Sequence, residues 1–109
     1  MPLISKALDD GQVASSAGRI YKSVGRVART RLKEVFFFNE NTTEETLILY
    51  LLRAGGTARK IYQAKLAPNE SVHWGSSEQI TLESGDELQA ETTTASKVNF
   101  VLGGVIEDA

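Results

Sequence analysis

Short apolar runs separated by turn-forming residues, at intervals of about 8 to 12 positions, constrain this chain more than any other feature. The turns are marked by Gly25, Gly55-Gly56, Pro68-Asn69, Gly75 and Ser84-Gly85-Asp86. Between them, segments such as 60–66 and 87–92 alternate apolar and polar residues, the period of a half-buried strand. No segment keeps a 3.6-residue apolar period over three turns. The pattern predicts an all-β, antiparallel sandwich of about eight short strands.

The chain has 109 residues, which suits one compact domain. We expect residues 19–109 to form the sandwich. Residues 1–18 contain glycine, serine and scattered aliphatic residues, and they predict an extended N-terminal arm that attaches to a neighbouring protein. The residues expected to make that attachment are Leu3, Ile4, Leu8 and Val13. We expect neither a signal peptide nor a membrane-spanning helix, since no apolar run approaches ~20 residues.

Two runs, Phe36–Phe38 and Leu47–Leu52, are apolar at consecutive positions and cannot present a single face to one core. Either the chain itself covers both faces of these strands, or a neighbouring subunit covers the second face. We favour the subunit, and therefore a homo-oligomer of unknown order. The residues predicted at its interface are Phe36, Phe38, Leu47, Leu49, Leu51 and Trp74. Trp74 is equally compatible with a plug at one end of the sandwich.

Residues suited to catalysis are scarce. The absence of cysteine excludes a disulfide scaffold, a thiol nucleophile and a cysteine-based zinc site. His73 is the single histidine, and adjacent acidic pairs such as Asp9-Asp10 point to opposite faces of a strand. Neither pair of glycines precedes the Gly-Lys-Ser/Thr of a phosphate loop. We therefore expect no catalytic residue, no metal and no cofactor, and a protein that is not an enzyme.

The formal net charge of −2 conceals an asymmetry along the chain. Residues 19–65 hold ten Lys and Arg against four Glu, whereas residues 66–109 hold one base against eight acids. Nucleic-acid contact through Arg26 to Lys33 is one interpretation. We favour the other, in which basic and acidic strands pair within one sheet or between subunits, because no exposed aromatics are interleaved with the bases.

Residues 19–107 also resemble a known class of protein. The resemblance begins with Ile20-Tyr21, Val35–Asn39 and the Gly-Gly-Thr loop that follows Leu47. Its most specific part is Ile80-Thr-Leu-Glu-Ser-Gly-Asp-Glu-Leu-Gln-Ala90, followed by the Thr/Ala/Ser turn and closing strand of residues 92–105. These segments are similar to the small β-sandwich proteins encoded in bacteriophage and prophage structural gene clusters.

The resemblance implies a jelly-roll-like virion component without enzymatic activity. Such a subunit is made in the host cytoplasm and docks on the capsid, neck or tail, with itself and other virion proteins as partners. The alternative is a carbohydrate-binding module at a phage tail tip. That module would use Trp74, Tyr62 and Tyr50 as platforms for a glycan.

Overall fold

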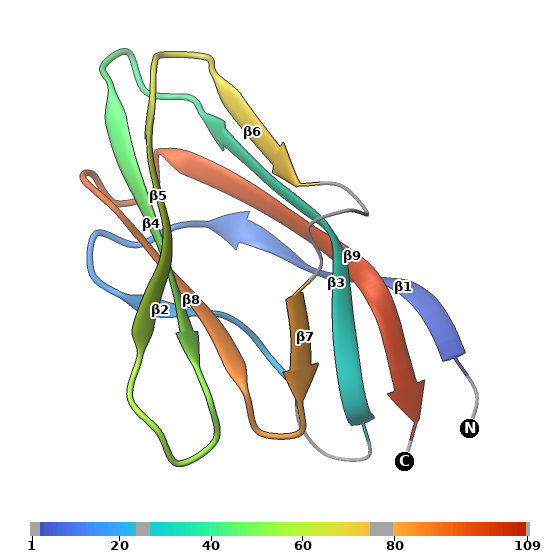
Figure 1. The fold of residues 1–109 in the computed structure, drawn as a ribbon. Coiled ribbons are helices and arrows are strands. Elements are labelled where there is room, and N and C mark those ends of the chain that lie inside the picture. Colours follow the sequence, from blue (N-terminus) through green and yellow to red (C-terminus); the bar gives the residue numbers. More distant parts are fainter. Residues whose placement is uncertain (1–2, 24–26, 75–79, 109) are drawn as a thin grey trace.

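The protein is a sandwich of two antiparallel sheets (Figure 1). The computed structural model describes residues 3–23, 27–74 and 80–108. At residues 3–6, 27–28, 74 and 108 it describes the backbone but not the side chains. No described residue is helical. The strands are β1 (Leu3–Gln12), β2 (Gly18–Lys22), β3 (Val27–Asn39), β4 (Glu45–Leu52), β5 (Arg59–Leu66), β6 (Ser71–Trp74), β7 (Ile80–Glu83), β8 (Glu87–Thr92) and β9 (Val98–Asp108).

The strand order is that of a jelly roll. One sheet runs β1-β9-β3-β6, and the other runs β2-β8-β4-β5. Strand β6 pairs with residues 35–38 of β3, and β7 pairs with residues 29–32 of the same strand. Together β6 and β7 occupy the position of one interrupted strand. Nine strands are found where about eight were predicted because β1 forms in the segment that was expected to be an arm. The prediction of an all-β antiparallel sandwich is confirmed.

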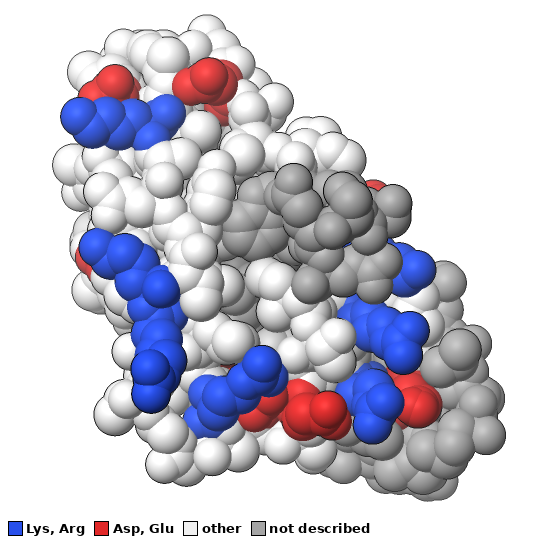
Figure 2. Space-filling view, viewed as in Figure 1, with Lys and Arg blue, Asp and Glu red and all other residues white. Residues whose placement is uncertain are grey.

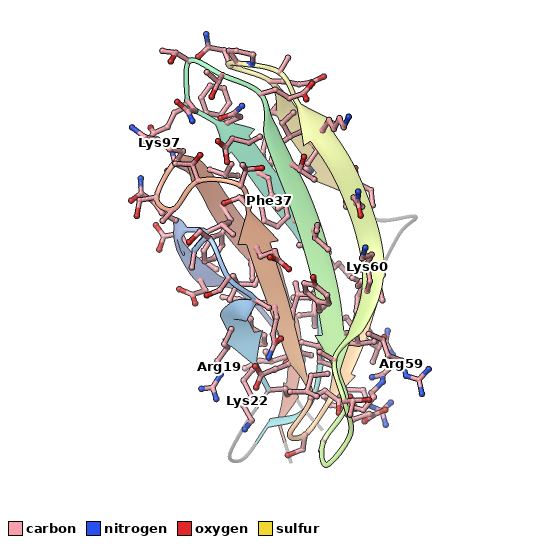
Figure 3. All side chains as sticks on the ribbon, turned by 90° about the vertical axis from the view of Figure 1, so that its left-hand side faces the viewer. Arg19, Lys22, Phe37, Arg59, Lys60 and Lys97 are labelled. Carbon is pink, nitrogen blue, oxygen red and sulfur yellow. The ribbon has the colours of Figure 1, made fainter. Side chains whose placement is uncertain are left out.

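The core lies between the sheets and is formed by alternate residues of their strands. Phe37, which Figure 3 shows between the sheets, packs against Phe100 with 6.4 Å between ring centroids. Full burial of one such side chain contributes about 1.5–3 kcal/mol. The side chains in the core that are at most 2% exposed include Val13, Leu32, Val35, Phe37, Leu47, Leu49, Leu66, Leu82, Leu88, Ala90, Val98 and Leu102.

Residues 3–12 form strand β1 of the sandwich and not the separate arm that the sequence suggested. Strand β1 pairs with β9 from Leu3 opposite Glu107 to Gln12 opposite Asn99. Leu8 packs against the core and Val13 lies within it, so neither is free to attach to another protein. The side chains of Leu3 and Ile4 lie outside the described residues. A register shift between Ala7 and Asp9 breaks the alternation, and that shift hid the strand in the sequence.

In strand β4, the side chains that we expected at a subunit interface face the core instead. Leu47 and Leu49 are fully buried in the core, and Leu51 packs against it. The prediction that these three residues form a subunit interface is therefore wrong. Successive side chains of a strand point to opposite faces, but both sets in this strand are apolar. The alternation of apolar and polar residues therefore could not predict which of the two sets of side chains faces the core.

A buried aspartate fastens the loops at one end of the sandwich. Asp86 is 3% exposed and accepts hydrogen bonds from Arg53 Nη1 at 2.6 Å, Ala54 N at 2.9 Å and Glu83 N at 3.0 Å. Burial by itself would raise the pKa of Asp86, but these hydrogen bonds and the Arg53 charge lower it below its ordinary value. Gly85 precedes it with φ of 92°, a conformation that glycine adopts without strain.

Asn39 and Glu45 fasten the opposite end. The Asn39 side chain donates to the carbonyl oxygens of Thr43, Leu66 and Ala67 at 3.0–3.2 Å. Glu45 is 1% exposed and accepts from Thr94 N at 2.8 Å and from Asn41 Nδ2 at 2.9 Å. Burial would raise the pKa of Glu45, yet the hydrogen bonds from Thr94 and Asn41 lower it overall. The two sheets are thus tied together at both ends by buried polar side chains.

Candidate functional site: the outer face of the five-stranded sheet

Three large apolar side chains are exposed together on the outer face of the β1-β9-β3-β6 sheet. Phe36 is 41% exposed, Phe38 38% and Val101 54%. Phe36 lies opposite Val101 on β9 and opposite His73 on β6, and the Phe36 and His73 rings are 4.5 Å apart. We call Phe36, Phe38 and Val101 the apolar patch. Alternation along Val35–Phe38 predicted Phe36 and Phe38 on one face, and the structure places them there.

A hollow lies beside the apolar patch, where β9 passes through Gly103 and Gly104. It has a volume of about 440 Å³ and is bordered by Ala7, Lys33, Glu34 and residues 101–105. The register of β1 shifts opposite it, between Ala7 and Asp9, and that of β3 shifts between Leu32 and Glu34. A Cβ atom on Gly104 would come within 2.2 Å of the Arg31 carbonyl oxygen. The close approach of β3 therefore requires glycine at this position.

Basic side chains lie on the side of the hollow toward the start of β3. Arg29, Arg31 and Lys33 line a depression of about 210 Å³ with Val105 and Glu107. Arg29 Nε is 3.7 Å from a Glu83 oxygen and 3.9 Å from a Glu107 oxygen. Arg31 and Lys33 form no ion pair with any described residue. In Figure 2 these bases appear beside β3 at the lower right, apart from a second set along β5 at the left.

Acidic side chains lie beside the apolar patch on β1 and just after the end of β3. Asp9 and Asp10 line a depression of about 330 Å³ that reaches Val101. Glu40 lies nearby and accepts hydrogen bonds from the amides of Gln12 and Asn99, both at 3.1 Å. Within the described part of the chain, none of these three carboxylates has a salt bridge. Asp10 therefore lies beside the apolar patch, level with Val101 and Phe36 across the sheet, while the basic side chains lie toward the start of β3.

The outer face of the β2-β8-β4-β5 sheet differs because its polar side chains bind one another. Arg19 lies 3.5 Å from Glu87, Lys60 donates to Gln63 at 3.0 Å, and Tyr50 donates to Glu91. The bond to Glu91 raises the pKa of Tyr50. Figure 3 looks onto this sheet and shows Arg19 and Lys22 at one margin, with Arg59 and Lys60 at the other. Several of its polar groups are therefore engaged within the chain itself.

The residues considered for glycan binding do not come together. Tyr50 lies on the outer face of its sheet, whereas Tyr62 packs against the core between the sheets. The backbone of Trp74 pairs with Val35, and its side chain lies outside the described residues. Arg26, considered for nucleic-acid contact, also lies outside them.

The described residues contain no cluster of three or more His, Asp or Glu side chains that could hold a metal ion. His73, the single histidine, is exposed and lies against Phe36. Within residues 3–23, 27–74 and 80–108, no helix is long and apolar enough to span a membrane.

Sequence reasoning missed Val101, Arg31, Lys33, Asp9 and Asp10 as members of one surface. Alternation from Val98 onward could have placed Val101 outward, since Phe100 and Leu102 flank it on the inward side. The two register shifts concealed that β1 and β3 both border the hollow.

Comparisons with known proteins support the fold. No family model matches the sequence, and no curated protein matches it. Among solved structures, this chain is similar to a protein of the Bacillus endospore appendages, described as a novel family of disulfide-linked pili. The TM-score is 0.61 with 14% sequence identity, over 97% of this chain and 88% of the other. At this identity the similarity shows a shared sandwich fold.

Proposed function

We propose that this protein is a non-enzymatic structural subunit of a bacteriophage virion. It packs against neighbouring proteins of the particle through the outer face of the β1-β9-β3-β6 sheet. One observation carries the proposal: Phe36, Phe38 and Val101 are exposed side by side on that face. Apolar side chains gathered on one face are typical of a protein contact.

The virion setting is supported by the resemblance of residues 19–107 to phage structural proteins. The segment that carries most of it has a structural explanation here. Leu82, Leu88 and Ala90 are core residues, while Gly85 and Asp86 form the turn that fastens the loops. Those residues maintain the sandwich, and the contact with neighbours falls on a different surface. The position in the particle, whether capsid, neck or tail, is open in this proposal.

A small contact suits a subunit present in many copies. Burial of apolar surface contributes about 25 cal/mol per Å², so the apolar patch alone supports a modest affinity. Repetition around a particle raises the overall strength of attachment without new contacts. The chain contains no cysteine, so its attachment would not use the disulfide links named for the similar pilus protein.

The test is incorporation into particles. Virions from a strain that encodes the gene are purified on a density gradient, and the protein is detected by mass spectrometry. We expect the wild-type chain in the particle fraction, and we expect the F36S/V101S variant to be lost from it. I61S is the matched control, because Ile61 is as exposed as Phe36 but lies on the other sheet. Absence of the wild-type chain from particles, or equal loss of both variants, would contradict the proposal.

A further inference from the structure

We propose that the outer face of the β2-β8-β4-β5 sheet binds the phosphate backbone of duplex nucleic acid. This function goes beyond the proposed contact with neighbouring proteins, which uses the other sheet. The observation behind it is a set of four bases at the two margins of the face: Arg19 and Lys22 on β2, and Arg59 and Lys60 on β5 (Figure 3). We call these four residues the basic corners.

The strand register places the first two basic corners level with each other across the sheet. Arg19 lies opposite Gln89 of β8, and Gln89 lies opposite Tyr50 of β4. Tyr50 in turn lies opposite Lys60 of β5. Strands β2 and β5 are three strand spacings apart, about 14 Å at roughly 4.8 Å per spacing. The major groove of B-DNA is about 12 Å wide, so the two margins can each contact one of the backbones that border it.

The other two basic corners lie one to two residues further along β4. Lys22 lies opposite Glu87 of β8, which lies opposite Leu52 of β4. Arg59 lies opposite Leu51. The offset from the first pair is about 3–7 Å at roughly 3.3 Å per residue. Each margin therefore carries two neighbouring bases, and all four lie toward the same end of the sheet.

The carboxylates of this face are bound within the chain itself. Glu87 is 7% exposed, lies 3.5 Å from Arg19 and accepts a hydrogen bond from Gln89 at 2.7 Å. Glu91 accepts from the hydroxyl group of Tyr50. Neither carboxylate forms an ion pair with the other basic corners among the described residues.

Three of the basic corners consequently keep an uncompensated charge. Lys22, Arg59 and Lys60 form no ion pair within residues 3–23, 27–74 and 80–108. Arg59 and Lys60 are exposed, and Lys22 is half-buried. Residues 46–69, which span β4 and β5, contain four bases and no acid. The β4–β5 margin is therefore cationic along its whole length, although the chain as a whole has a formal net charge of −2.

Unpaired acids lie on the opposite side of the molecule. Asp10, Glu34 and Glu40 belong to the outer face of the β1-β9-β3-β6 sheet. The shortest extent of the molecule is 21 Å, about twice the Debye length of ~10 Å at 0.1 M salt. Those carboxylates are thus screened from a polyanion bound to the basic corners.

The residue types favour a duplex over a protein or a single strand. Lysine is depleted at protein–protein interfaces, whereas lysine and arginine make most contacts to phosphate. Single strands bind by stacking their bases on aromatic rings. Tyr50 is half-buried with its hydroxyl group bonded to Glu91, and Tyr62 packs against the core. The face supplies charge without a stacking platform, which suits the outside of a duplex.

Salt-dependent binding of DNA tests the proposal. The probe is a fluorescent duplex of mixed sequence and about 30 base pairs, titrated with the full chain at about 50 to 200 mM NaCl and followed by anisotropy. Each phosphate contact contributes about −0.9 to the slope of log K against log salt, so three to four contacts should give a slope near −3. R59Q/K60Q removes two contacts and should flatten the slope by about 2, with a Kd raised about tenfold or more at 50 mM.

Matched controls separate this face from the rest of the chain. R31Q/K33Q also removes two unpaired bases, but from the other sheet, and should bind as wild type does. K22Q neutralises the opposite margin and should flatten the slope by about 1, which tests the face a second time if R59Q/K60Q does not fold. F36S/V101S should bind DNA as wild type does, so failure of the proposed function would leave this result unchanged.

Failure of the wild-type chain to bind the duplex at about 0.5 mM protein and 50 mM NaCl would overturn the proposal. The bases would then serve to protect the edge strands β2 and β5 from pairing with other strands. Equal weakening by R31Q/K33Q would also overturn it. Competition by poly-L-glutamate as strong as by the duplex would make an acidic protein the ligand, and tighter binding of an oligothymidylate of equal length would make it a single strand.

Discussion

Replacement of Asp86 by asparagine should destabilise the fold more than any other single exchange of a carboxylate for its amide. Asparagine retains one oxygen, which can still accept from Ala54 N. Its amino group, however, stands where Oδ2 accepts from Arg53 Nη1 and Glu83 N. The bond to Arg53 accounts for about 1 kcal/mol, since that side chain is half exposed. An N–H group left without its acceptor costs about 1–2 kcal/mol more.

We therefore expect D86N to lower the free energy of unfolding by about 2–3 kcal/mol. For a domain of this size that corresponds to a fall in Tm of roughly 10–15 °C. Urea unfolding followed by circular dichroism measures the change as a shift in midpoint at constant m-value. The R53Q variant removes the cation and keeps both backbone bonds, so it should cost about 1 kcal/mol or less.

The exposed residue Glu44 provides the matched control, and E44Q should fall within about 0.5 kcal/mol of wild type. A D86N variant as stable as E44Q would refute the reasoning, because the loops would then be held without the carboxylate. A lowered m-value would instead show that D86N alters the compactness of the native or unfolded state.

Three further outcomes follow from the same structure. Folded-state pKa values of Asp86 and Glu45 lie below their ordinary 3.8 and 4.5, so the unfolded chain binds protons more readily. The stability these groups provide should be complete above about pH 5 and lost as pH falls below about 4, with a shallower loss in D86N, as urea titrations across that range will show. G104A should lower Tm by more than 10 °C, or prevent folding, because its Cβ would meet the Arg31 carbonyl oxygen at 2.2 Å; a melt within 2 °C of wild type would contradict this. Deletion of residues 1–12 should reduce Tm and promote aggregation in size-exclusion chromatography, since it exposes the edge of β9, whereas a dispensable arm would leave both unchanged.

The sequence predicted the strands well where one side of each strand is polar. Residues 87–92 and 60–66 alternate, and both are strands with the expected bounds to within a residue. Alternation fails to assign the inward face where both sets are apolar, as in Leu47–Leu52. It also fails at a bulge, where one extra residue reverses the phase, as between Ala7 and Asp9.

For a related reason, the sequence predicted only some residues of the candidate site. Phe36 and Phe38 were found because they adjoin Phe37 on one strand. Arg31 and Asp10 are far apart along the chain, and only the pairing of β1 and β3 with β9 puts them on one face. Gly103 and Gly104 lie in the middle of the last strand, where glycine is uncommon. The strand continues through them, because glycine is what the neighbouring backbone requires there.

The pairing of β1 with β9 has a mechanical consequence. Residues 3 and 107 lie opposite each other, and both ends of the chain leave the sandwich at the same corner (Figure 1). Tension applied between those two residues would open the β1–β9 hydrogen bonds one after another, as a zipper opens, so little force would suffice. Tension applied between that corner and the loops at the far end would load the same bonds together, in shear. A subunit held at both ends of its long axis would therefore resist strain that would unzip one held by its two termini.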